Sequence, residues 1–293
     1  MAQLSRPLAG PASPRSARTA VQLRHFGVNL IFYAIMSALA VVFLAPLLWM
    51  VTASLKPEYL VLAIPPTFLP RHFQWENYAV VLGVIPIFAY NSFKLAFLTV
   101  GGVLLITPLA AYAFARLHFW GRDFAFSILM ATLMVPGIVT LIPLYIIYKN
   151  IGWIDTHYPL WVPKVLHSVT AIFLLRQFFR QIPMDLEDAA RLDGATTFQV
   201  YWRIMLPQIK PALAAVGIFA FLDSWNDLFG PLIFLNTLEL QTLPVALKLF
   251  QGEFFTQISV LMAGATLSIV PVLIVFFAAQ KYFLQGITMT GIK

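Results

Sequence analysis

The chain of 293 residues contains no cysteine and few charged residues. Without cysteine it cannot form disulfides, thiolate zinc sites, iron–sulfur clusters or a cysteine nucleophile. Asp, Glu, Lys and Arg make up only 11% of the chain, whereas they make up roughly a quarter of a soluble domain. The sequence also lacks a GxxxxGK[ST] phosphate loop, so the chain cannot hydrolyse ATP by that route. These absences exclude a free cytosolic enzyme and an ordinary DNA-binding domain.

What the chain has in abundance is apolar sequence, with 60% hydrophobic residues and a mean hydropathy of +0.82. A helix needs about 20 apolar residues to cross a bilayer core of about 30 Å, so long stretches without charge are candidate transmembrane helices. Four stretches carry no Asp, Glu, Lys or Arg, and two weaker ones carry a few charges. They are residues 26–55, 95–115, 124–148 and 254–280, with 158–179 and 211–235 as the weaker pair. We therefore predict an all-α membrane protein with six transmembrane helices.

The net charge of +7 is explained by how the basic residues are distributed among the loops. When alternate loops are assigned to opposite sides, 13 of the 19 Lys and Arg residues fall on the side that holds both chain ends. Cytoplasmic loops carry the excess of Lys and Arg, so both termini are predicted to be cytoplasmic. The expected location is a cytoplasmic membrane, crossed several times, and a nucleic-acid partner loses its support.

The first 25 residues differ in composition from the rest of the chain. They are rich in Pro, Ser, Ala and Arg and contain no acid, which is typical of a disordered segment. We predict a disordered basic cytoplasmic tail over residues 1–25 and a single transmembrane domain over residues 26–293.

The loop over residues 181–213 carries the signals of two short helices. Asp185 is the expected N-cap of the first helix, and Asp193-Gly194 is its expected end because glycine readily adopts the left-handed conformation. Thr196 and Gln199 have the spacing of a capping box and are expected to start the second helix. Two interpretations are open on this evidence: a hairpin that lies on lipid headgroups, or an element that docks into another protein.

The order of residues in this loop closely resembles the EAA loop of ABC-importer permeases. The matching positions are Asp188, Ala189, Ala190, Asp193, Gly194, Ala195, Ile204, Leu206, Pro207, Pro211 and Leu213. Outside the loop, Trp225-Asn226-Asp227 with Pro231-Leu232, and the tail 286–293, resemble the MalG-like carbohydrate permeases. One position departs from the pattern, because the usual Glu falls on Asp188 while Glu187 lies beside it.

The resemblance implies a coupling helix at residues 187–192 that inserts into a cleft of a partner ATPase, where Asp188 or Glu187 pairs with an Arg. Gly194 would provide the corner. The ATPase-coupling residues implied are Glu187, Asp188, Ala189, Ala190, Asp193, Gly194, Leu206 and Pro207. The implied partners are a second, MalF-like permease, an ATPase dimer, an extracytoplasmic solute-binding protein and membrane lipid. The chain itself would be no enzyme and would bind no cofactor, since ATP and Mg would be bound by the ATPase.

The fifth predicted span contains two acids, and charges inside a bilayer usually mark function. Asp223 lies about 18 Å into this span, near its middle, and Asp227 shares its helical face. Carboxylates and amides bind hydroxyl groups, and an indole face can stack on a sugar. The predicted substrate pathway is Asp223, Trp225, Asn226 and Asp227. In the alternative, the two acids bind side chains of a partner subunit and hold a helix interface together.

The other ionisable residues of the spans are predicted to have no direct role. Lys164, His157 and His167 are expected to be interfacial or to snorkel, and their spacing does not suit a metal site. Because the spans lack a central cation, a neutral solute is favoured. Proline residues, among them Pro136, are expected to kink their helices.

The function favoured by these features is that of the permease subunit of an ATP-driven, binding-protein-dependent importer. It would move a sugar, either an oligosaccharide or a related polyol, by alternating access, with the loop as a lever moved by the ATPase. An importer of a glycerol-phosphate derivative is an alternative. A proton-coupled transporter that relays protons through Asp223 and Asp227 is less favoured, and an intramembrane aspartyl protease is disfavoured because both acids lie on one helix and no GxGD sequence is present.

Overall fold

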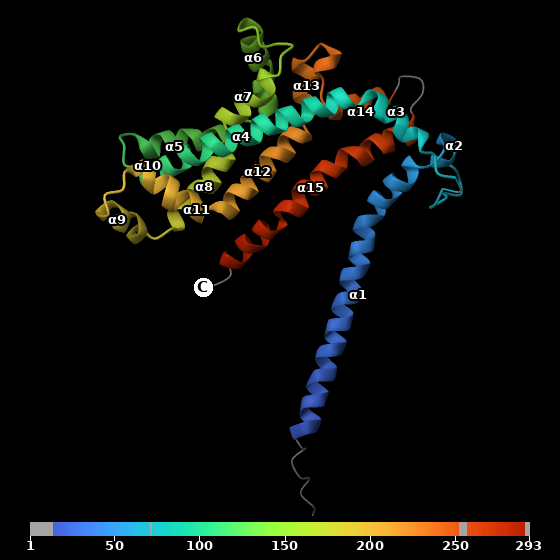
Figure 1. Cartoon of the computed structure of the whole chain (residues 1–293), viewed down its shortest axis with the longest axis horizontal. Helices are drawn as coiled ribbons and strands as arrows, with labels where there is room; N and C mark the ends of the chain where they lie inside the picture. The colour runs from blue at the N-terminus through green and yellow to red at the C-terminus, as the bar shows by residue number, and fades with distance from the viewer. Residues whose placement is uncertain (1–13, 71, 252–256, 291–293) are drawn as a thin grey trace, which may run out of the picture. The chain divides into compact units, whose positions relative to one another are not determined.

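The computed structural model describes residues 14–70, 72–251 and 257–290. The chain divides into two compact units, Met1–Thr52 and Ala53–Lys293. The elements of the described residues are helices (Figure 1), which agrees with the predicted all-α class.

The described part of unit 1 is one long helix, α1 (Pro14–Ser54), of 41 residues, whose last two residues belong to unit 2. Its first turns cover residues 14–25, which we predicted to be disordered, so that prediction is wrong for the described part of the tail; residues 1–13 lie outside the described residues. The segment contains Ala, Arg, Gln and Leu, which are good helix formers and extend the helix that the apolar run begins. The portion Asn29–Ser54 is long and apolar enough to cross a membrane.

Unit 2 contains the remaining helices. Its first half holds α2 (Glu58–Val61), α3 (Glu76–Val84), α4 (Pro86–Arg116), α5 (Arg122–Ala131), η1 (Thr132–Met134), α6 (Gly137–Asn150), α7 (Tyr158–Leu166) and α8 (Val169–Gln181). Its second half holds α9 (Met184–Leu192), α10 (Thr197–Gln199), η2 (Val200–Met205), α11 (Leu206–Gln208), α12 (Lys210–Trp225), α13 (Phe229–Phe234), η3 (Leu238–Leu240), α14 (Leu243–Leu249) and α15 (Ile258–Thr290).

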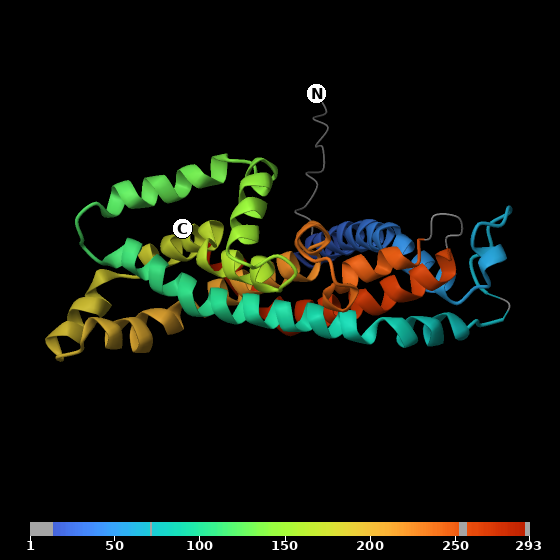
Figure 2. The same cartoon turned by 90° about the horizontal axis from the view of Figure 1, so that it is seen from above.

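Helix α4 is the central element of unit 2. It packs against α7, α8 and α12, and α12 in turn packs against α15, an arrangement visible along the length of α4 (Figures 1 and 2). The contact between α4 and α7 is close, because a Cβ on Gly102 would lie 2.5 Å from Cγ2 of Val165. A glycine is therefore required at this point for α7 to sit against α4.

Among the residues that the structure describes, four helices are long and apolar enough to span a membrane, and up to six spans result if each of two bent helix pairs counts as one. The predicted third span is such a pair, since α5 with η1 meets α6 at an angle of 99°. Pro136 causes this break: Val135 before it is extended, and α6 begins directly after it. The kink expected at Pro136 is thus confirmed, and a straight helix over 124–148 is excluded.

The predicted fifth span is also interrupted. Helix α12 ends at Trp225, Asn226 caps it, and α13 begins only at Phe229. A continuous helix over 211–235 is therefore wrong, and so is the placement of Asp227 on the same helical face as Asp223. At its other end α12 joins the helical segment Thr197–Gln208 at an angle of 79°.

Candidate functional site

The loop over residues 181–213 is a helical hairpin. It lies near the C-terminal end of α4, the end that leads into α5 (Figure 1). Its corner is Gly194, which has a φ of +83°. The Gly194 N–H donates to the Arg191 carbonyl at 3.0 Å, and the Ala195 N–H donates to the Ala190 carbonyl at 2.9 Å. These two bonds form a Schellman motif, which satisfies the last carbonyls of α9 and requires a left-handed residue at the corner. The predicted glycine corner is confirmed.

Of the two N-terminal helix caps predicted in this hairpin, one is present and the other is not. The box of Thr196 and Gln199 is confirmed, because each side chain bonds the other residue's backbone N–H. Asp185 does not cap the first helix, which begins at Met184 directly after Pro183 and has no side-chain cap. Proline fixes the backbone at the helix start, so Asp185 lies one residue inside, where its charge still suits the positive end of the helix dipole.

The second arm of the hairpin is amphipathic. Tyr201 and Met205 are buried in the core that α4 and α8 share with the hairpin. On the opposite side, Phe198 and Trp202 are exposed, and their rings stack with centroids 6.4 Å apart. The middle of this arm, η2, is π-helical, an irregularity that is frequent at functional sites. The hairpin therefore presents an aromatic outer face while its inner face holds it to the bundle.

The two neighbouring acids of α9 point in opposite directions. Glu187 is 1% exposed, and its Oε1 accepts hydrogen bonds from the Tyr112 hydroxyl and from the Arg191 guanidinium, each at 3.0 Å. Asp188 is exposed, as are Ala189 and Leu192. Glu187 is therefore used inside the protein, whereas Asp188 is available to a partner.

Arg116, the last residue of α4, lies beneath this hairpin and was not singled out by the sequence. Its Nε is 3.9 Å from Oε2 of Glu187. Its guanidinium group also donates to the carbonyl of Phe179 at 2.7 Å and to that of Ile182, at the C-terminal end of α8. A cation suits this end of a helix, where carbonyls lack intrahelical partners. One side chain thus joins α4, α8 and α9.

The remaining predicted coupling residues lie along the same hairpin. Ala190 is buried and packs in the core, Asp193 caps the end of α9, Leu206 is half-buried and Pro207 is exposed. Pro211 lies in the first turn of α12, as the sequence predicted.

A separate cavity of about 850 Å³ lies where α12 ends, at the predicted substrate pathway. Its walls come from α6, α7, the end of α12 and the start of α13, and its polar lining includes Thr140, Lys164, Asp223, Asn226 and Asp227. Three of the four predicted substrate-pathway residues are therefore brought together at this cavity.

Lys164, which the sequence predicts to be interfacial or to snorkel, is paired with two acids at this cavity. Its Nζ lies 2.9 Å from a carboxylate oxygen of Asp223 and 2.9 Å from one of Asp227. It also donates to the Asp223 main-chain carbonyl at 3.1 Å. The ammonium group of Lys164 thus makes two ion pairs and one hydrogen bond at the end of α12. Because α12 ends two residues later, Lys164 also neutralises an acid at the negative end of a helix dipole.

The second acid of this cluster is held by its own loop. Oδ1 of Asp227 accepts a hydrogen bond from the Gly230 N–H at 2.9 Å. A Cβ on Gly230 would lie 2.8 Å from Oδ2 of Asp227 and 3.0 Å from Leu160. Gly230 therefore lets the loop approach close enough for Asp227 to reach Lys164.

Trp225 does not face the cavity. It is 1% exposed, its Nε1–H donates to the Ser268 carbonyl at 3.1 Å, and its ring stacks on Phe221. In this structure it has no face open to a solute, because α12 turns it toward α15. Asn226 does line the cavity, and its Nδ2 donates to the Leu222 carbonyl at 3.0 Å.

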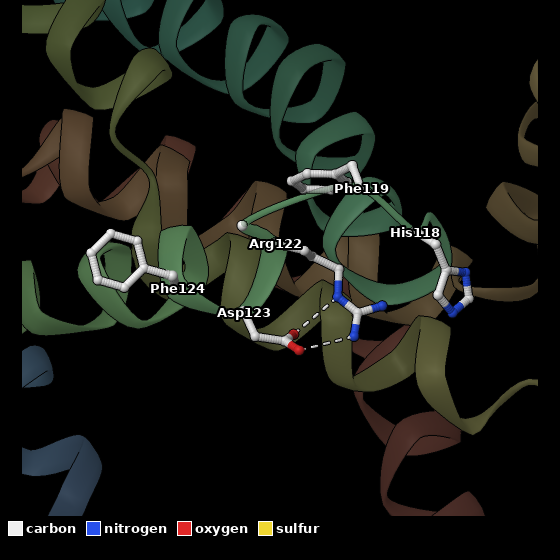
Figure 3. A pocket seen from close by; sticks show the side chains of 6 residues that line it. His118, Phe119, Arg122, Asp123 and Phe124 are labelled. Carbon is white, nitrogen blue, oxygen red and sulfur yellow. Dashed lines mark hydrogen bonds and ion pairs between the residues drawn. The ribbon is translucent and has the colours of Figure 1, made fainter.

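A smaller hollow of about 280 Å³ lies at the corner between α4 and α5 (Figure 3). Its Arg122 and Asp123 side chains pair with each other through two bonds of 2.9 and 3.2 Å. His118 lies on the other side of the Arg122 guanidinium group from Asp123 (Figure 3). The acid and the base of this hollow satisfy one another, so it is a weaker candidate for a solute site than the larger cavity. Within the described ranges, no cluster of three or more His, Asp or Glu could hold a metal ion.

Comparisons with known proteins give a consistent result. Residues 102–289 match the family described as "Binding-protein-dependent transport system inner membrane component". The chain is 33% identical to the arabinooligosaccharides transport system permease protein AraQ of Bacillus subtilis over 87% of this chain and 92% of that protein. It is 34% identical to the sulfoquinovosyl glycerol transport system permease protein SmoH of Agrobacterium fabrum over 85% and 89% of the two chains.

A solved structure is similar over nearly the whole length. It is a chain of a bacterial ABC transporter involved in the import of the acidic polysaccharide alginate, with a TM-score of 0.73 and 25% identity. The match covers 94% of this chain and 100% of that one.

Proposed function

The chain belongs to the family of binding-protein-dependent transport system inner membrane components, and from that premise we propose that it is the permease subunit of an ATP-driven sugar importer. Members of this family are membrane subunits and not catalytic ones, and ATP hydrolysis lies in partner subunits. The protein is accordingly a multi-pass membrane protein. Membership also implies an ATPase and a solute-binding partner.

The observation that carries the proposal is the hairpin with one acid inside and one outside. Asp188 is exposed beside Leu192, with the stacked Phe198 and Trp202 on the other arm. An exposed acid with apolar neighbours suits a cleft that supplies an Arg and an apolar lining. We assign the ATPase contact to Asp188 and the inner, structural role to Glu187. The contact is then made from the position where the EAA loop usually has Glu, although Asp188 has a shorter side chain.

The inner contacts give the hairpin a way to transmit movement. Glu187 bonds Tyr112 of α4, and Arg116 of α4 bonds the end of α8. A displacement of α9 by the ATPase would therefore pull on α4 and, through Arg116, on α8. Helix α4 packs against α7 and α12, which line the larger cavity. This supports a lever that couples nucleotide binding to alternating access.

The cluster at the larger cavity favours a neutral polyhydroxyl cargo. Two carboxylates face one ammonium group, which leaves a formal charge of −1. The charge of Lys164 is compensated by these two carboxylates, so the cluster offers no uncompensated cation to a phosphate or a carboxylate of a solute. Asp223 and Asn226, by contrast, are exposed and can bond solute hydroxyls. A sugar fits this chemistry better than a glycerol-phosphate derivative.

The rest of the assembly follows from the same proposal. If each bent pair is one span, the chain crosses the membrane six times, and both termini lie in the cytoplasm. A second, MalF-like permease completes the pathway, an ATPase dimer binds ATP and Mg, and an extracytoplasmic binding protein delivers the sugar. This chain binds no cofactor, and its outer helices contact lipid.

The test is uptake by proteoliposomes that contain the complete importer, measured with and without a proton uncoupler. We expect uptake to require ATP and the ATPase subunits and to continue when the uncoupler is present. A proton-coupled transporter, in which Asp223 and Asp227 relay protons, would lose uptake with the uncoupler and would not need the ATPase.

A further inference from the structure

A second cavity of about 540 Å³ adjoins the cluster of Lys164, Asp223 and Asp227. Lys164 and Asp223 line both this cavity and the larger one, so their ion pair forms a wall that the two cavities share. The walls of the second cavity come from α4, α7, the start of α8 and the second half of α12. Two of them, α4 and α8, are the helices that Tyr112 and Arg116 connect to the hairpin.

One residue of this cavity has an unmet bonding requirement. Thr99 on α4 is 1% exposed, and its Oγ1 has no hydrogen-bond partner in the protein. A threonine inside a helix commonly bonds the carbonyl four residues earlier, but Thr99 does not. A buried hydroxyl without a partner is costly, and a hydroxyl of a bound solute would supply the missing partner.

The rest of the lining is mostly apolar, with a few hydroxyl-bearing and aromatic side chains. Ser168 and Thr170 add two more hydroxyl-bearing side chains, and Phe173 and Phe219 add aromatic ones. Hydroxyls bond the polar edge of a sugar, and aromatic faces cover its apolar side. The volume lies inside the range of about 300–1,000 Å³ that small-molecule sites occupy.

We propose that the 540 Å³ cavity is a second solute subsite that takes a neutral sugar unit, with Thr99 as a specificity-determining hydroxyl. This rests on the proposed function and extends it, because it gives the sugar a place on each side of the Lys164–Asp223 pair. A solute that moves from the first cavity to the second passes this ion pair, whose exposed carboxylate can bond its hydroxyls on the way.

The chain offers a matched pair of variants for the test. Thr99 and Thr107 both lie on α4, are both 1% exposed, and both have an unpartnered Oγ1. Thr107 does not line the cavity. Each Thr→Val replacement removes an unpartnered buried hydroxyl, so both proteins should fold.

The measurement is uptake by the complete reconstituted importer of whichever of trehalose, lactose and arabinotriose the wild type transports best. We expect Thr99→Val to raise the KM for uptake about fivefold, the effect of one lost hydrogen bond, and Thr107→Val to leave it unchanged. Equal KM values for the two variants would overturn the subsite while leaving sugar import intact. If the wild-type importer takes up none of the three sugars, the proposed function fails and the subsite fails with it.

A labelling experiment gives a second, independent readout. Because the chain has no cysteine, Thr170→Cys provides a single thiol in the cavity, and Thr197→Cys provides one on the exposed hairpin. We expect the transported sugar to slow modification of the Thr170→Cys importer by a methanethiosulfonate reagent, and not that of Thr197→Cys. No protection at residue 170 at a saturating sugar concentration would contradict the subsite.

Discussion

Arg116 and Glu187 face each other in the buried space between α4 and α9, with Nε of Arg116 3.9 Å from Oε2 of Glu187. Their side chains are 5% and 2% exposed, so both charges have been removed from water. Removing one partner of such a pair leaves an uncompensated buried charge, which costs about 3–5 kcal/mol. The pair therefore fixes the base of the hairpin, although neither residue is available to the ATPase.

The neighbouring acids of α9 allow this to be tested directly. We predict that Glu187→Ala lowers the free energy of unfolding by about 3 kcal/mol, because it strands Arg116. Asp188→Ala should change stability by no more than about 0.5 kcal/mol, because the side chain is exposed, yet it should abolish sugar-stimulated ATPase activity of the assembled importer. Thermal unfolding of the purified variants and ATPase assays provide the two readouts. A stable Glu187→Ala protein together with a fully active Asp188→Ala importer would refute the assignment.

The corner of the hairpin makes a second prediction. Gly194→Val places a β-branched residue at a φ of +83°, where the strain is roughly 1–2 kcal/mol, and it should uncouple ATP hydrolysis from sugar while the protein still inserts into the membrane. Gly121→Val is the matched control, because Gly121 also has a positive φ (+77°) and open space around its Cα but lies outside the hairpin. Coupling lost equally in both variants would mean that backbone strain alone, and not the hairpin corner, is responsible.

The cluster at the larger cavity predicts a change of specificity. In the double variant Asp223→Asn with Asp227→Asn, the charge of Lys164 is no longer compensated. We expect the ratio of uptake of an acidic alginate trisaccharide to uptake of a neutral sugar to rise at least about fivefold, because a cation in a site of low dielectric attracts anions. Adding Lys164→Met to the double variant should remove this gain. A gain that persists without Lys164 would show that the cation is not its source.

A clamp outside the spans predicts a dependence on pH. Oδ1 of Asp155 accepts hydrogen bonds from the N–H groups of Asn236 and Thr237, and Oδ2 accepts one from the Thr237 hydroxyl. These bonds, with that of the Thr237 hydroxyl the strongest, hold the pKa of Asp155 below its usual value. A lowered pKa in the folded state means that the clamp stabilises the protein above the ordinary pKa of about 3.9, and that this contribution is lost as the pH falls through the lowered value.

The readout for this clamp is the difference in melting temperature between the wild type and Asp155→Asn. Asn tolerates the positive φ of 61° at this position, so the backbone is preserved. We expect the wild type to melt at the higher temperature at pH 7 and the difference to shrink as the pH is lowered from 5 to 3. A difference that does not vary with pH would mean that the Asp155 charge plays no part.

Much of the fold and of the hairpin was predictable because the signals are local. The left-handed Gly194, the capping box of Thr196 and Gln199, and the break at Pro136 each depend on residues within a few positions of one another. The apolar runs likewise gave the helical class, although they did not reveal that α12 stops at Trp225. The composition of the sequence cannot show where α12 ends. Asp227 lies beyond the end of the helix, where it bonds Gly230 and pairs with Lys164.

The chemistry of the site was less predictable, because it depends on distant residues. Lys164 and Asp223 are 59 positions apart, and Arg116 and Glu187 are 71 positions apart. Neither pair follows a spacing rule, so the sequence alone predicts an interfacial or snorkelling Lys164 and leaves open whether Glu187 or Asp188 contacts the ATPase. The burial of Trp225 was missed for the same reason, since its partner Ser268 lies on α15.

The central claim is that this chain moves sugar only when an ATPase acts on its hairpin. The most direct measurement is sugar uptake into proteoliposomes that contain the complete importer, compared with proteoliposomes that contain the permease subunits alone. The account predicts ATP-dependent uptake in the first preparation and none in the second, with Asp188→Ala reducing the first to the level of the second. Sugar accumulation by the permease subunits alone would contradict it.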